Sequence, residues 1–130
     1  MSDFVGKDLR GFTVVLPEST WTHAQPHLDA LKGRYLLVVK TIQAPTLVLD
    51  NPHYLPRPGE PARVGHERYV RFFEELNTHI IVPMKIIEDR QVIAGHGTVE
   101  AGTRIAVTIH PGATVPNGAI IWGGTKWATP

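Results

Sequence analysis

The sequence predicts an α+β fold, with an N-terminal helical segment, an antiparallel β-sheet meander, and a Gly/Pro-rich β C-terminal extension. Three observations support this order. A helical apolar run ends at Pro45, two strand-like runs follow at 67–75 and 79–87, and the last thirty residues are small, apolar and punctuated by turns. A chain of 130 residues has enough apolar side chains for one core, so we expect a single domain over residues 1–130.

The composition excludes several classes of protein. Thirteen basic side chains nearly cancel twelve acidic ones, which excludes a large, uniformly basic surface for nucleic acid but leaves room for a local basic patch. Cysteine is absent, so disulfide scaffolds, thiolate zinc sites and thiol catalysis are excluded together. No apolar stretch is long enough to span a membrane, and the first residues do not resemble a signal peptide. We therefore expect a soluble, cytoplasmic protein with no membrane partner.

The first half of the chain predicts a strand and then helices. Residues 12–16 are rich in β-branched and aromatic side chains, which is typical of a short strand. Ser19 and Thr20 are N-cap candidates, so a helix is expected to begin near them. The apolar run 34–43 is short enough to be a buried helix or a strand. Its helical spacing and the stop at Pro45 favour the helix.

The second half predicts the meander. Residues 46–50 form a predicted strand, and 51–65 carry four prolines, which indicates an exposed loop. A strand over 79–87 and a further strand over 92–99, weakened by two glycines, complete the series. Within 67–75 the pattern alternates, so two sets of side chains should lie on opposite faces of the strand. These sets are Tyr69, Arg71 and Phe73 on one face, and Val70 and Phe72 on the other.

The C-terminal part, 100–130, is predicted to form two or three short strands beyond a core at 12–99. The segment 116–118, Pro-Asn-Gly, is a strong turn signal. A faint six-residue spacing is also typical of an alternative architecture, a β-solenoid. The period drifts along the chain, however, so the meander is the preferred prediction.

Four segments in a fixed order give a family resemblance that covers residues 12–99. The segments are Trp21-x-His23, Thr41-Ile-Gln-Ala-Pro45, Tyr69, and His79-Ile-Ile-Val-Pro-Met-Lys85. Their order resembles phage-associated domains of the barnase/EndoU/colicin/RelE-like (BECR) nuclease superfamily. This resemblance implies one or two helices followed by a four-stranded antiparallel sheet. It also implies metal-independent cleavage of RNA, with the 2′-hydroxyl as nucleophile and a cyclic phosphate as product.

Such a reaction needs a base, an acid and cationic donors, and four residues are candidates for catalysis. His23 and His27 lie four residues apart and would share a helix face, one as base and the other as acid; alternatively they only cap and solvate the helix. Lys85 ends an apolar strand and could hold a phosphate; alternatively it is an edge-strand lysine that opposes aggregation. His96, between two glycines, lies where a ligand could approach the backbone closely; alternatively it is a turn histidine.

Three residues of the strand at 67–75 are candidates for substrate binding. A base could stack on Tyr69 while Arg68 or Arg71 holds a phosphate. Cross-strand charge pairing explains the two arginines equally well. His79 could belong to a site on the sheet or be a satisfied, partly buried histidine. The remaining histidines lie beside prolines or glycines in predicted loops and are assigned no role: His53, His66 and His110.

Two classes of function follow from these residues. The first is a metal-independent endoribonuclease or toxin-like nuclease of phage or prophage type. Its target would be RNA, with tRNA as a candidate, and an immunity protein or phage structural protein could be its partner. The second is a non-catalytic phage or bacterial accessory protein that uses the same fold as a binding or assembly module. No third ligand accompanies His23 and His27 at metal-site spacing, so neither a metal nor another cofactor is expected.

Overall fold

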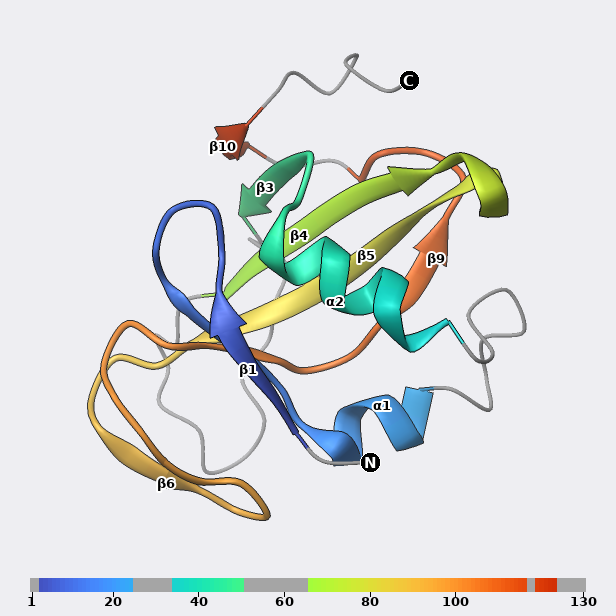
Figure 1. The fold of residues 1–130 in the computed structure, drawn as a ribbon. Coiled ribbons are helices and arrows are strands. Elements are labelled where there is room, and N and C mark those ends of the chain that lie inside the picture. The colour runs from blue at the N-terminus through green and yellow to red at the C-terminus, as the bar shows by residue number, and fades with distance from the viewer. Residues whose placement is uncertain (1–2, 25–33, 51–65, 117–118, 124–130) are drawn as a thin grey trace.

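The computed structural model describes residues 3–24, 34–50, 66–116 and 119–123. The main element of this structure is one mixed β-sheet, and helix α2 lies across one face of it, over β4 and β5 (Figure 1). No helix within the described ranges is both long and apolar enough to cross a membrane. The elements are β1 (Phe4–Lys7), β2 (Thr13–Leu16), α1 (Glu18–Ala24), α2 (Tyr35–Gln43), β3 (Leu47–Asp50), β4 (His66–Phe73), η3 (Glu74–Leu76), β5 (Thr78–Ile86), β6 (Gln91–Ile93), β7 (Gly97–Val99), β8 (Arg104–Ala106), β9 (His110–Gly112) and β10 (Ile120–Gly123).

The predicted fold class is wrong at both ends of the chain. The chain begins with the β1–β2 hairpin rather than with a helical segment, and the two helices are short and follow that hairpin. Strand β1 has four residues, one of them Gly6, so it carries too little alternation to be recognised alone. Its antiparallel pairing with β2, from Phe4 opposite Leu16 onward, is what makes it a strand.

The C-terminal strands are not an extension to a meander. The order of strands in the sheet is β1-β2-β8-β5-β4-β3-β10, and β9 pairs with β5 beside the β8 position. Strand β8 therefore lies inside the sheet, parallel to β2 and antiparallel to β5. Parallel pairing of segments this far apart in the chain leaves no local sequence signal.

The prediction of one strand over residues 92–99 is also corrected. This segment forms a separate two-stranded hairpin, β6–β7, with a turn at Ala94–His96. Gly95 and Gly97 have φ values of 79° and 129°, which only glycine adopts readily, so the chain reverses there. The predicted helix over 34–43 and the strands over 46–50, 67–75 and 79–87 are confirmed within a residue or two at each end.

The predicted alternation of β4 is confirmed, and it decides the two faces of the sheet. Tyr69 and Phe73 pack beneath α2, together with Val82 of β5. Val70 and Ile81 pack in a different cluster on the opposite face, with Leu47 and Leu49 of β3. Consecutive side chains along β4 or β5 therefore lie on opposite faces of the sheet, in different clusters.

Pro83 lies inside a central strand without breaking it. Its carbonyl oxygen accepts a hydrogen bond from the Val107 N–H at 2.9 Å, so this edge of Pro83 faces the chain between β8 and β9. Strand β5 pairs with β8 through residues 84–86 and with β9 through residues 79–81. The proline nitrogen thus falls at the gap between these two ladders, where no donor is required.

A buried network of five polar side chains joins the β1–β2 loop, β4 and β8 on the α2 side of the sheet. Arg10 donates from Nη1 to Glu67 Oε2 at 3.1 Å and from Nη2 to Glu67 Oε1 at 2.8 Å. The same Nη2 donates to the Tyr69 hydroxyl at 2.8 Å, and that hydroxyl donates to Asp8 Oδ2 at 2.5 Å. Arg104 Nε reaches Glu67 Oε1 at 3.3 Å. We call these residues the ion network: Asp8, Arg10, Glu67, Tyr69 and Arg104.

The ion network also holds the loop between β1 and β2. Asp8 Oδ1 accepts hydrogen bonds from the backbone N–H groups of Arg10 and Phe12. The Phe12 ring lies between two guanidinium groups, 3.6 Å from Arg104 Cζ and 4.9 Å from Arg10 Cζ. Such contacts stabilise a cation over an aromatic face. One short loop is therefore attached to two distant strands.

Burial and hydrogen bonding set the protonation states in the ion network. Burial, and then the hydrogen bond to Asp8, raise the pKa of Tyr69, so the phenol stays protonated and can donate. Burial opposes the charge of Arg10, but Glu67 and Tyr69 outweigh it and hold the pKa of Arg10 above its usual value. Arg10 therefore stays cationic, and Tyr69 stays a hydrogen-bond donor, within the ion network.

We expect Glu67→Gln to lower the free energy of unfolding by about 3–5 kcal/mol, because two buried guanidinium groups would lose their shared counter-ion. Urea denaturation measures the change. The matched control is Glu100→Gln, which removes the exposed pair with Arg90 and should cost less than about 1 kcal/mol. Equal losses in the two variants would contradict a stabilising role for the ion network.

Candidate functional site

The face of the sheet opposite α2 carries a short row of basic side chains. Because Glu67 and Tyr69 point towards α2, His66 and Arg68 point to the other face. The register places His66 opposite Lys85 of β5. Cross-strand neighbours of this kind lie close enough to interact. We call His66, Arg68 and Lys85 the basic band.

Lys85 is the most informative member of the basic band. It lies on β5, which is central in the sheet, so the reading of Lys85 as an edge-strand lysine is wrong. The side chain is half-buried between His66 and Ile105, its register partners on either side. Within the described ranges it forms no hydrogen bond or ion pair. Since a partly buried ammonium group without a counter-ion is unfavourable, this position suits an anionic ligand.

The Arg68 side chain is anchored to the backbone of β3. Its Nε and Nη2 donate to the backbone oxygen of Asp50 at 2.9 and 2.7 Å. Burial lowers the pKa of Arg68, and the charge of Asp50 offsets part of this effect. An arginine still remains a cation at neutral pH. Arg68 and Lys85 therefore place two positive charges on neighbouring strands of one face.

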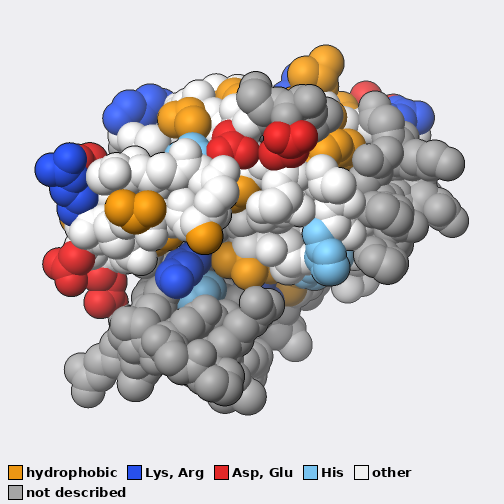
Figure 2. Space-filling view, turned by 90° about the horizontal axis from the view of Figure 1, so that it is seen from below, with side chains coloured by type: hydrophobic (Ala, Val, Ile, Leu, Met, Phe, Trp, Pro, Cys, Tyr) orange, Lys and Arg blue, Asp and Glu red, His pale blue; other side chains and the backbone are white. Residues whose placement is uncertain are grey.

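The face shown in Figure 2 carries charges of both signs. In the space-filling view of Figure 2, basic, acidic, histidine and hydrophobic side chains are interspersed over the face shown. This agrees with the near balance of thirteen basic and twelve acidic residues. Attraction of an anion would therefore depend on the local arrangement of the basic band.

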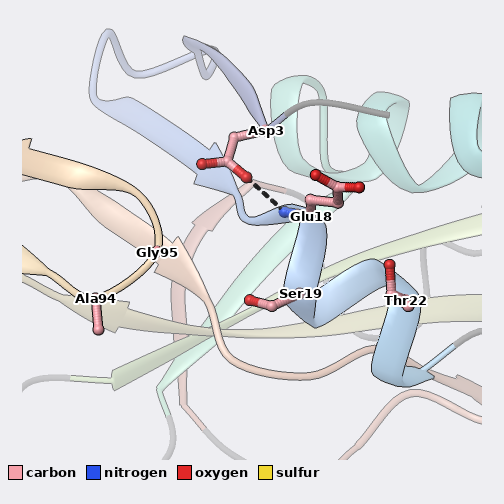
Figure 3. Close-up of a pocket in the computed structure, with 6 residues that line it drawn as sticks. All are labelled: Asp3, Glu18, Ser19, Thr22, Ala94 and Gly95. Atoms are coloured by element: carbon pink, nitrogen blue, oxygen red, sulfur yellow. Dashed lines mark hydrogen bonds between the residues drawn. The ribbon is translucent and has the colours of Figure 1, made fainter.

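A second candidate site is an open cleft between α1 and the turn of the β6–β7 hairpin (Figure 3). Its volume is about 350 Å³. Asp3 Oδ1 accepts the backbone N–H of Glu18 at 2.7 Å, and Asp3 Oδ2 accepts a hydrogen bond from His96 Nδ1. The backbone bond, and then His96, lower the pKa of Asp3. The residues that line the cleft are Asp3, Glu18, Ser19, Thr22, Ala94 and Gly95.

The electrostatics of this cleft do not suit a phosphate. The charged groups among its lining residues are the carboxylates of Asp3 and Glu18, and the lining includes no lysine or arginine. Carboxylates repel an anionic substrate. His96 is oriented by Asp3, an arrangement typical of a base, but His96 lies beside an acidic cleft.

The structure separates the residues that the sequence proposed as one site. His23 is exposed on α1, one helical turn after Ser19 of the cleft, and His96 is at the hairpin turn. His27 lies outside the described residues. Lys85 and Arg68 face the side of the sheet opposite α2, and so do not share a site with Tyr69 or Arg71.

Tyr69 and Arg71 face α2. Tyr69 is 0% exposed and its hydroxyl is engaged by Asp8 and Arg10, so a base cannot stack on it in this structure. Arg71 donates to the backbone oxygen of Ala44 at 2.8 Å and lies over the Phe73 ring. Its contacts are those of a residue that joins α2 to the sheet.

Sequence reasoning missed two histidines that the fold brings to the face of the basic band. His66 begins β4 opposite Lys85, and His110 begins β9 opposite Ile81. Each follows or precedes a glycine or proline, which indicated a loop. For His66 a signal existed, because the alternation of β4 extends back to it from Arg68. His79, by contrast, is buried, with its Nδ1 3.0 Å from the Gly112 oxygen.

The described residues hold no cluster of three or more histidine, aspartate or glutamate side chains placed to bind a metal ion. Comparisons with models of protein families, with curated proteins and with solved structures give no match for this chain. The function of this protein is therefore inferred from the chemistry and geometry of the basic band and of the cleft.

Proposed function

We propose that this protein is a metal-independent endoribonuclease and that the basic band is its active site. The observation that supports the proposal is Lys85: a half-buried ammonium group on a central strand, with no counter-ion within the described residues. Arg68 adds a second cation two register positions away on the same face, opposite Pro83. Two such cations suit a phosphodiester, whose single negative charge increases in the phosphorane transition state.

The basic band provides the cations that this reaction requires. Cleavage of RNA through the 2′-hydroxyl builds negative charge on the phosphorus-bound oxygens, and nearby cations stabilise that charge in the transition state. An imidazole exchanges protons near neutral pH, and His66 lies directly opposite Lys85. The nucleophile belongs to the substrate, so the protein needs no nucleophile of its own. The products would be a 2′,3′-cyclic phosphate and a 5′-hydroxyl.

The first test of the proposed cleavage is to incubate the purified protein with total RNA in the presence of EDTA. Fragments that end in 2′,3′-cyclic phosphate support the proposal. RNA that is bound but remains intact across pH 5–9 would instead identify the second class of function, a non-catalytic binding module. If EDTA alone abolished cleavage, the reaction would need a metal and the proposal would fail.

We expect Lys85→Met to lower the rate of RNA cleavage by about 10²–10³-fold, because one cation beside the developing phosphorane charge is lost. The matched control is Lys40→Met, which removes the same charge from an exposed position on α2 and should change the rate by less than about twofold. Thermal unfolding checks that both variants fold. Equal effects would argue against the basic band.

The cleft offers the competing location, and two variants distinguish it. We expect His96→Gln and His23→Gln to retain cleavage within about threefold of the unaltered protein, since the cleft lining is acidic. A loss of about 10²-fold or more in either variant, with normal folding, would move the reaction from the sheet to the cleft.

The salt dependence of RNA binding measures how many phosphates the protein contacts. If Lys85 and Arg68 provide the main phosphate contacts, a plot of log affinity against log salt should have a slope of about −1.4, for two phosphates on a single strand. A slope steeper than about −4 would indicate a broad basic surface, which contradicts the proposed site.

A further inference from the structure

A third histidine, His110, lies on the same face as the basic band. It is the first residue of β9, and the register places it opposite Ile81 of β5. Ile81 packs on the face away from α2, so the His110 side chain is on that face too. β9 and β4 pair with opposite edges of β5, so His110 and Arg68 lie on either side of it. The His110 side chain is accessible to solvent.

The spacing leaves room for a nucleotide between His110 and Lys85. Ile81 and Lys85 are four residues apart on β5, which corresponds to roughly 13 Å. Pro83 lies midway between them on the same face, and Arg68 is its register partner on β4. A phosphodiester placed over Pro83 would thus have a cation on two sides and an imidazole on a third.

The surroundings of His110 favour its neutral form. Partial burial by neighbouring atoms lowers the pKa of His110, a hydrogen bond to the Pro111 carbonyl acts in the opposite direction, and the charge of Arg68 lowers the pKa further. Because proline has no N–H, the imidazole is the donor in that bond. The second ring nitrogen of the neutral ring is then an acceptor for a proton.

Other charged and titratable groups also face this region. Those on the strands beside His110 are Arg68 and His66 on β4, and Lys85 and His79 on β5. Asp50 is the register partner of Glu67 and so lies on the α2 side. The positive charge of Arg68 opposes protonation of His110.

We propose that His110 is the general base of the ribonuclease site, an inference that rests on the function proposed above. His110 takes the proton from the 2′-hydroxyl, and the 2′-oxygen forms a bond to phosphorus. The bond from phosphorus to the 5′-oxygen breaks, and that oxygen takes a proton from the Lys85 ammonium group. Exchange with solvent then restores both side chains.

Two variants test this role by the pH dependence of kcat/KM. The rate should rise with pH as His110 loses its proton and then level off, because only the neutral imidazole is a base. His110→Gln should lower the rate by about 10²–10⁴-fold and remove this rise. The matched control, His23→Gln, should keep both. Arg68→Gln should move the rise to higher pH, because a repelling charge is lost.

An NMR titration gives a readout that does not depend on activity. The imidazole proton signal of His110 should titrate at a higher pH in Arg68→Gln than in the unaltered protein, because the repelling charge of Arg68 is lost. An unchanged midpoint would overturn the coupling of His110 to Arg68, and with it this proposal.

The two proposals fail in different ways. If the unaltered protein does not cleave RNA, the ribonuclease function fails and the role of His110 fails with it. If the unaltered protein cleaves RNA and folded His110→Gln cleaves it at the same rate with the same pH profile, only the role of His110 is overturned.

Discussion

One buried carboxylate, Glu67, carries the interaction on which the rest of the structure depends. It receives Arg10 from the β1–β2 loop and Arg104 from β8, and so attaches two distant parts of the chain to β4. Removal of one partner from a buried ion pair costs several kcal/mol, since the remaining charge loses its compensation. The position of β8 between β2 and β5 is therefore supported by charge as well as by backbone pairing.

The alternation of β4 places its structural side chains on one face of the sheet and its candidate functional side chains on the other. Glu67 and Tyr69 face α2 and hold the sheet together, whereas His66 and Arg68, their neighbours in the chain, face the opposite side. The two faces differ in how charge is compensated. On the α2 side carboxylates and guanidinium groups balance within the ion network, while on the other side Lys85 has no counter-ion within the described residues. Unbalanced charge beside a rigid, paired sheet is what makes that face suitable for an anion.

Local patterns predicted those parts of the fold that depend on local physics. The helix at 34–43, the central strands and the two faces of β4 follow from spacing, from proline stops and from alternation. For the candidate site, residue type and strand pattern place the cations Arg68 and Lys85 on β4 and β5, and their binding of phosphate stays a prediction. Tyr69 was predicted to stack on a base, but α2 and the loop that carries Arg10 bury it.

The sequence by itself determined which side chains alternate on each strand and that cations occur on β4 and β5. Only the tertiary structure decided which face α2 covers, where β1 and β8 pair, and that His110 lies across β5 from Arg68. The physical reason is the range of the interactions. Alternation and helix spacing arise between residues a few positions apart, whereas strand order and burial arise from pairing and packing between segments that meet only in the folded chain.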